Sequence, residues 1–86
     1  MEKRIGCVAI LLTDLHVVSE INTILSNCGS IIIGRLGLPV KDRGVHVISV
    51  IVDGTTDEIG AMTGKIGRLK SVQVKSVLTK ATNSEE

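Results

Sequence analysis

The sequence contains no phenylalanine, tyrosine or tryptophan among its 86 residues. Proteins that bind single-stranded nucleic acid usually stack bases on aromatic side chains, so this mode of binding is disfavoured. The ten basic and nine acidic residues leave a net charge of +1, which gives no basic patch for a phosphate backbone. We therefore expect that the chain alone does not bind nucleic acid, although an oligomer could still present a helix or ribbon to DNA.

Long apolar runs and paired cysteines are missing as well. No apolar stretch reaches the roughly 18 residues of a membrane-spanning helix. The apolar run at residues 5–12 follows a charged start, but it lacks the small-residue cleavage site of a signal peptide. Cys7 and Cys28 are far apart and form no CxxC motif, unlike the disulfide sets of small secreted domains. We expect a cytoplasmic protein that does not associate with membranes.

Aliphatic residues are what the sequence has in excess. Hydrophobic residues make up 43% of the chain and, without aromatics, are almost all Ile, Val, Leu and Ala. β-Branched side chains favour strands. A chain of this length builds only a modest core. We therefore expect more apolar surface than one monomer hides, and burial of the excess against another subunit.

The spacing of the apolar residues predicts the element order β-α-β-β-α-β. Strands are expected at 5–12, from residue 31 to about Pro39, at 45–52 and at 72–79, with helices after residue 14 and after residue 55. The first and third strands are apolar on both faces, which is typical of central strands covered on both sides. Glycines at 34 and 37 and Pro39 indicate a bulged edge strand.

Turn and cap residues mark the ends of these elements. Thr13 and Asp14 are expected to cap the first helix, and Gly29 to end it in a left-handed conformation. Gly44 is placed to close the hairpin at positive φ. A capping box is predicted from Thr55 and Glu58, and residues 53–54 are expected in the turn before it. The glycines inside the second helix are interpreted as positions of close packing: Gly60, Gly64 and Gly67.

This order is the split β-α-β, or ferredoxin-like, arrangement. We predict an α+β fold with a four-stranded antiparallel sheet and two helices on one face. One domain is expected over residues 1–80, followed by a polar, disordered tail at 81–86. Because two helices cover only one face of such a sheet, the other face or an edge is predicted to be buried in a homo-oligomer, a dimer or a tetramer.

Two segments carry a resemblance to a known family. They are Ile33-Gly34-Arg35-Leu36-Gly37-Leu38-Pro39 and residues 45–69, which begin Val45-His46-Val47 and include Asp53-Gly54-Thr55; the opening residues 2–6 support them. Over about residues 3–80 the chain resembles a family of small regulators of the iron-only hydrogenase system. That family has an ACT-like, ferredoxin-like fold related to the C-terminal regulatory domain of nickel-responsive repressors.

The resemblance implies a regulatory role and a ligand at a subunit interface, because ACT-like domains typically bind a small effector there, often an amino acid. Many ACT domains have a glycine in the turn between the first strand and first helix, whereas residues 13–16 contain none. The nickel-responsive repressors use a cluster of histidines and a cysteine, and the two histidines of this chain do not match it.

Candidate ligand-binding residues lie on the second and third predicted strands. Arg35, between Gly34 and Gly37, could offer its guanidinium and open backbone amides to an anion, or could simply lie in solvent on an edge strand. His46 could bind a ligand or pack at an interface. Cys7 lies on a neighbouring strand, but a tetrahedral zinc site would need further ligands from another subunit. No metal or other cofactor is predicted.

Catalytic motifs are not recognisable in the sequence. No histidine is tied by spacing to a nucleophile and an acid, and there is no phosphate-binding loop. We therefore predict a protein that is not an enzyme. The favoured hypothesis is an oligomeric regulatory module that senses a small effector or a partner protein. The alternative is a DNA-associated transcriptional regulator acting as an oligomer or with a partner.

Overall fold

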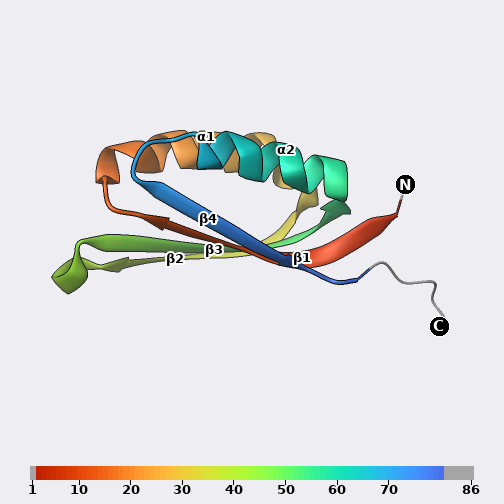
Figure 1. Ribbon diagram of the computed structural model, residues 1–86, viewed down its shortest axis with the longest axis horizontal. Coiled ribbons are helices and arrows are strands. Elements are labelled where there is room, and N and C mark those ends of the chain that lie inside the picture. Colours follow the sequence, from red (N-terminus) through yellow and green to blue (C-terminus); the bar gives the residue numbers. More distant parts are fainter. Residues whose placement is uncertain (1, 81–86) are drawn as a thin grey trace.

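The chain folds into a four-stranded antiparallel sheet with two helices packed on one face (Figure 1). The computed structural model describes residues 2–80, and the tail predicted at 81–86 lies outside them. The sheet order is β2-β3-β1-β4. Its elements are β1 (Lys3–Leu12), α1 (Val18–Asn27), β2 (Ile32–Val40), β3 (Val45–Thr55), α2 (Thr56–Gly67) and β4 (Val72–Leu78). The predicted α+β, ferredoxin-like fold is confirmed, with β1 and β3 in the centre as expected.

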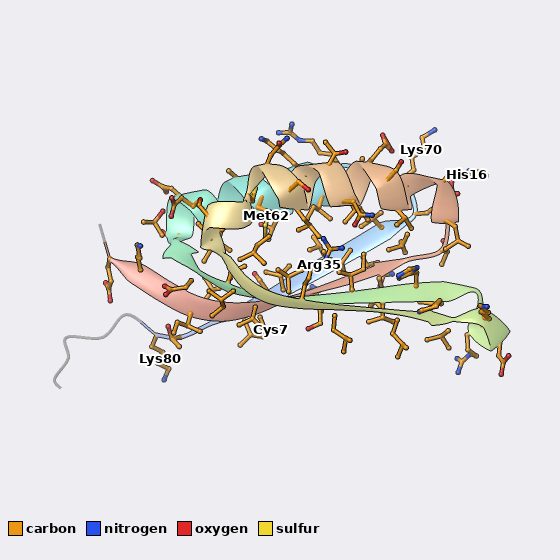
Figure 2. All side chains as sticks on the ribbon, turned by 180° about the vertical axis from the view of Figure 1, so that it is seen from behind. Cys7, His16, Arg35, Met62, Lys70 and Lys80 are labelled. Atoms are coloured by element: carbon orange, nitrogen blue, oxygen red, sulfur yellow. The ribbon has the colours of Figure 1, made fainter. Side chains whose placement is uncertain are left out.

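The hydrophobic core lies between the sheet and the helices. Alternate residues of β1 and β3 point into it, as the period of two along a strand requires. Each helix adds one apolar stripe at the helical period. The fully enclosed side chains come from all four of these elements: Val8, Ile10, Leu12, Ile21, Leu25, Ile48, Val50, Val52, Ile59, Met62 and Ile66. Figure 2 shows Met62 between the layers.

The edge strands have the irregularities that their glycine and proline residues predicted. The register of β2 against β3 shifts between Ile32 and Gly34, which is the expected bulge. Pro39 lies on β2, an edge strand, where its missing N–H does not interrupt the sheet. Gly44 closes the β2–β3 hairpin with φ +66°. The predicted turn at residues 53–54 is wrong, since β3 continues to Thr55 while paired with β1.

Two predictions about glycine are also wrong. Gly29 does not adopt positive φ; α1 ends at Asn27 with Cys28 as its C-cap, and a 3-10 turn follows, Gly29–Ile31. Gly60 and Gly64 are not positions of close packing, because a Cβ built on either meets nothing within 4 Å. Only Gly67 has a neighbour there, Val74 Cγ1 at 3.4 Å, which is an ordinary contact distance.

The predicted cap of the second helix is confirmed, whereas the prediction for the first helix is wrong: α1 has Val17 as its N-cap, without a side-chain hydrogen bond. Asp14 Oδ1 accepts a hydrogen bond from the His16 backbone N–H at 2.9 Å and caps the 3-10 turn that leads into α1. At α2 the capping box is complete. Thr55 Oγ1 accepts from the Glu58 N–H at 3.1 Å, and Glu58 Oε1 accepts from the Thr55 N–H at 2.8 Å. The pKa of Glu58 is lowered from its ordinary value of 4.5, chiefly by the hydrogen bond from the Thr55 backbone and then by that from its hydroxyl.

Removing this cap is expected to destabilise the domain. Thr55→Ala should lower the free energy of unfolding by about 1 kcal/mol, because the first turn of α2 loses a hydrogen-bond partner. A depressed carboxyl pKa stabilises the fold above the unfolded value and loses that effect as the pH falls through the folded pKa. Urea unfolding followed by far-UV circular dichroism, at about pH 7 and about pH 3, should show a smaller effect of Thr55→Ala in acid.

Thr56→Ala is the matched control, since it deletes a hydroxyl one residue later that caps nothing. Equal losses of stability from Thr55→Ala and Thr56→Ala would contradict the role of the capping box.

Candidate functional site

The sheet face away from the helices is apolar and uncovered. Along β1 and β3 the odd-numbered residues point to this side, while their even-numbered neighbours enter the core. We call this surface the open face. Among the described residues, six of the eight large hydrophobic side chains that are exposed lie on it: Ile5, Leu11, Leu36, Leu38, Ile51 and Val77. Figure 2 shows Cys7 on the same side, below the sheet. Within one chain, β1 and β3 are therefore covered on one side, and the expectation that another subunit covers the other side stays a prediction.

The centre of the open face is lined by small side chains. Ala9 on β1 pairs with Ser49 on β3. Cys7, two residues before Ala9 on β1, is its neighbour on the same face. The Cys7 Sγ and Ser49 Oγ atoms are 3.4 Å apart, close enough for a weak hydrogen bond. We call these three residues the waist. Larger aliphatic side chains flank the waist on the neighbouring strands, with Leu36 beside Ser49 and with Ile51 and Val77 beside Cys7.

Charge is confined to the margins of the open face. Lys3 and Asp53 lie at the end where β1 begins and β3 finishes. Lys75 lies on the edge strand β4, in the same row as Ala9 and Ser49. The long aliphatic stem of a lysine can cover apolar surface while its ammonium group reaches solvent. The middle of the face therefore holds no charged side chain among the described residues.

Two hollows adjoin the end of the open face where β1 turns towards α1. The larger, of about 430 Å³, is lined by Leu11, Thr13, Val45, Ser71, Val72 and Gln73. The second, of about 340 Å³, shares Thr13 and Val45 with it and extends to Leu15 and the β2–β3 hairpin. Volumes of this order are typical of small-molecule sites. Their polar groups are mainly hydroxyls and an amide, and Lys41 is the one charged residue in either lining.

Ser71 gives this end of the sheet a strained backbone. It has φ +64° and is the one non-glycine residue with positive φ among those described. Its carbonyl accepts a hydrogen bond from the Thr13 N–H at 3.2 Å, which ties the start of β4 to the end of β1. Strain of this kind costs energy and gathers at ligand-binding positions. The sequence analysis did not single out Ser71 or the hollows, because both depend on where two distant chain segments meet.

The predicted ligand-binding residues do not form one cluster. Arg35 and Gly37 pair with Val50 and Ile48, which places them on the helix side of β2. The Arg35 guanidinium donates from Nη2 to Asn22 Oδ1 on α1 at 2.7 Å, and Figure 2 shows it reaching up from the sheet. His46 lies near Gly37, where a Cβ built on the glycine would be 3.6 Å from its Nε2. Gly34 pairs with Ile51 and so belongs to the open face.

Cys7 and His46 cannot share a metal ion within one chain. Their strands pair, as predicted, but Cys7 lies opposite Ile51 and His46 lies opposite Leu12. The two residues are thus five positions apart in register and on opposite faces. Within residues 2–80 no group of three or more His, Cys, Asp or Glu side chains is placed to hold a metal ion.

The architecture and the open face define a small ferredoxin-like α+β domain, and comparison with known proteins places it in a family. Residues 4–76 match the model of the TM1266-like family, described as "Iron-only hydrogenase system regulator, putative". The chain belongs to this family, as the resemblance noted in its sequence predicted. No curated protein matches the chain.

One solved structure supports this assignment, and two others share only the fold. The uncharacterized protein TM1266 from Thermotoga maritima superposes with a TM-score of 0.86 at 31% identity, over 92% of this chain and all of that one. The C-terminal domain of MgtC from Mycobacterium tuberculosis shares the fold with a TM-score of 0.70 at 10% identity, over 95% of this chain and 94% of that one. A homoserine dehydrogenase from Thiobacillus denitrificans contains the same fold in 17% of its length, matching 90% of this chain with a TM-score of 0.64 at 19% identity.

No helix formed by residues 2–80 has the length and apolar character needed to cross a membrane.

Proposed function

We propose that the chain is a homo-oligomeric regulatory module of the iron-only hydrogenase system that binds a small effector or a partner protein where subunits meet. The observation that carries this proposal is the open face. Monomeric proteins rarely expose so many neighbouring aliphatic side chains, and surfaces of this kind mark protein interfaces. Family membership supplies the regulatory context.

The two hollows support an effector site beside such an interface. Leu11 and Gln73 lie on the open face and also line the larger hollow, so a subunit covering that face would narrow its mouth. An effector with hydrogen-bonding groups suits the hydroxyls of Thr13 and Ser71 and the amide of Gln73. Binding that favours one subunit arrangement over another would then shift the equilibrium between them, which is how a sensor transmits its signal.

The catalytic alternative has less support in the structure. Glu58 has a lowered pKa, but its carboxylate is already used as the partner of Thr55 in the capping box. Perturbed groups in a cleft are the usual sign of an active site. We propose accordingly that the protein binds and signals and does not catalyse a reaction.

Native mass spectrometry of protein purified from its own host tests the proposal. Its concentration is set by backbone absorbance, because the chain lacks Trp and Tyr. We expect an oligomer that carries extra mass, and that mass identifies the effector class. A clean monomer would contradict the proposal. An oligomer without added mass, combined with a salt-sensitive shift of promoter DNA, would favour the DNA-associated regulator instead.

A further inference from the structure

We infer that the open face is covered by a second copy of this chain, packed face to face about a two-fold axis that passes over the waist. This inference rests on the proposed oligomeric function and adds to it the surface, the partner and the orientation. The competing arrangement joins two chains through an edge strand, β2 or β4, and would leave the open face in water.

The arrangement of small and large side chains on the open face suits packing against a second copy of the chain. The small side chains of Cys7, Ala9 and Ser49 occupy the centre of the face. Larger side chains border them: Leu36 beside Ser49, Ile51 and Val77 beside Cys7, and Leu11 and Leu38 in the next row. A two-fold interface places the same patch on both partners, so the patch must be complementary to itself. Small residues at the axis let the sheets approach to about 10 Å, and the aliphatic ends then interdigitate as in β-sandwiches.

The size of the open face is close to what a stable dimer needs. With strands about 4.8 Å apart and outward residues about 6.8 Å apart, five outward rows on each of β1 and β3 and at least three on each of β2 and β4 give a projected area of about 500 Å². The accessible area exceeds this projection, because side chains protrude from it. Stable interfaces bury about 800 Å² per partner, with a lower limit near 600 Å². Covering the whole face comes close to this range, whereas an edge contact alone would bury much less.

The chemistry of the face also favours a second copy over another kind of partner. Interfaces with transient partners depend on Trp, Tyr and Arg anchors, and none of these lies on the open face. Homodimer interfaces are more apolar and resemble a domain core cut in two. An aliphatic surface with charge only at Lys3, Asp53 and Lys75 has this character.

A matched pair of lysine substitutions tests the surface. Leu36 on the open face is 67% exposed, and Ala61 on α2 is also exposed, so neither substitution disturbs the monomer core. Leu36→Lys should raise the dissociation constant of the oligomer about 100-fold, because it places an unpaired charge in the interface. Ala61→Lys, on the helix layer and outside both hollows, should leave it unchanged. Sedimentation velocity over a dilution series measures both, and far-UV circular dichroism confirms that each variant is folded.

Crosslinking tests the orientation. In a Cys7→Ser, Cys28→Ser background, Ala9→Cys should give a covalent dimer in high yield with a short bis-maleimide, since the two copies of residue 9 face each other across the axis. Ala61→Cys on α2, in the same background, should stay uncrosslinked. The reverse pattern would overturn the inference.

The outcomes also separate this inference from the function on which it rests. If the wild-type chain is an oligomer and Leu36→Lys leaves it intact, the face-to-face arrangement is overturned and the oligomeric function stands. If the wild-type chain is a monomer at every concentration, both are overturned. Loss of the oligomer in Leu36→Lys, with retention in Ala61→Lys and crosslinking at residue 9, establishes the interface whether or not an effector is found.

Discussion

Gly6→Ala is expected to destabilise the domain by about 3 kcal/mol, a large effect for the addition of one methyl group. A Cβ at this position would lie 2.7 Å from the backbone carbonyl oxygen of Val77 and would overlap Leu78 Cδ2. The leucine side chain can rotate, but the carbonyl belongs to β4, which pairs with β1 at this point. Relief therefore requires that the two strands separate, with loss of their ladder hydrogen bonds.

The measurement is urea unfolding by far-UV circular dichroism, with the slope of the transition compared between variants. Gly60→Ala is the control with the opposite sign, because Gly60 lies in the middle of α2 and a Cβ there meets nothing within 4 Å. It should stabilise the protein by about 1 kcal/mol through helix propensity and the smaller entropy of the unfolded chain. If Gly6→Ala and Gly60→Ala lowered the free energy of unfolding by similar amounts, the close contact of Gly6 with β4 would not be what requires a glycine at this position.

The order of the elements could be predicted from the sequence because it depends on local periodicity. Runs that are apolar on both faces identified β1 and β3, and the apolar residues within 17–28 recur at the helical spacing. The Thr55 and Glu58 capping box was predictable for the same reason, since both partners lie within one turn. Gly44 at positive φ closed the hairpin as its position in a short loop required.

The roles of the other glycines could not be predicted from neighbouring residues. Gly6 needs its small size because of Val77, which is 71 positions away in the sequence but adjacent in the sheet. Gly60 and Gly64 suggested close packing by their spacing, yet both face open space. The spacing of glycines along a helix shows where close approach is possible, and only the tertiary structure shows whether a neighbour is there.

The candidate site was predictable only in outline. An excess of aliphatic residues with two helices for four strands implied an uncovered face, and the structure places six large apolar side chains there. The residues singled out individually, Arg35 and His46, lie on the helix side instead. Ser71 and the hollow beside Thr13 gave no sequence signal, because they arise where the starts of β3 and β4 meet the end of β1.

The second large effect is expected for Ile10→Ala. Comparison of Ile10→Ala with a substitution on the opposite face of β1 measures how much each face contributes to the free energy of unfolding. Ile10 is completely enclosed between the sheet and the helices. Truncation to alanine should lower the free energy of unfolding by about 3–4 kcal/mol, since buried apolar contacts are lost and a cavity remains. A loss of this size is a large part of the total stability expected for a small domain.

Ile5 is the matched control, because it is the same residue type on the same strand but points to the open face and is 51% exposed. In a Leu36→Lys background, which removes the proposed partner, Ile5→Ala should cost less than about 1 kcal/mol in urea unfolding. In the wild-type background Ile5→Ala should instead weaken subunit association, with the greater effect at low protein concentration. Equal costs for Ile10→Ala and Ile5→Ala in the monomeric background would mean that something within the chain itself covers the open face, and the argument for a partner there would fail.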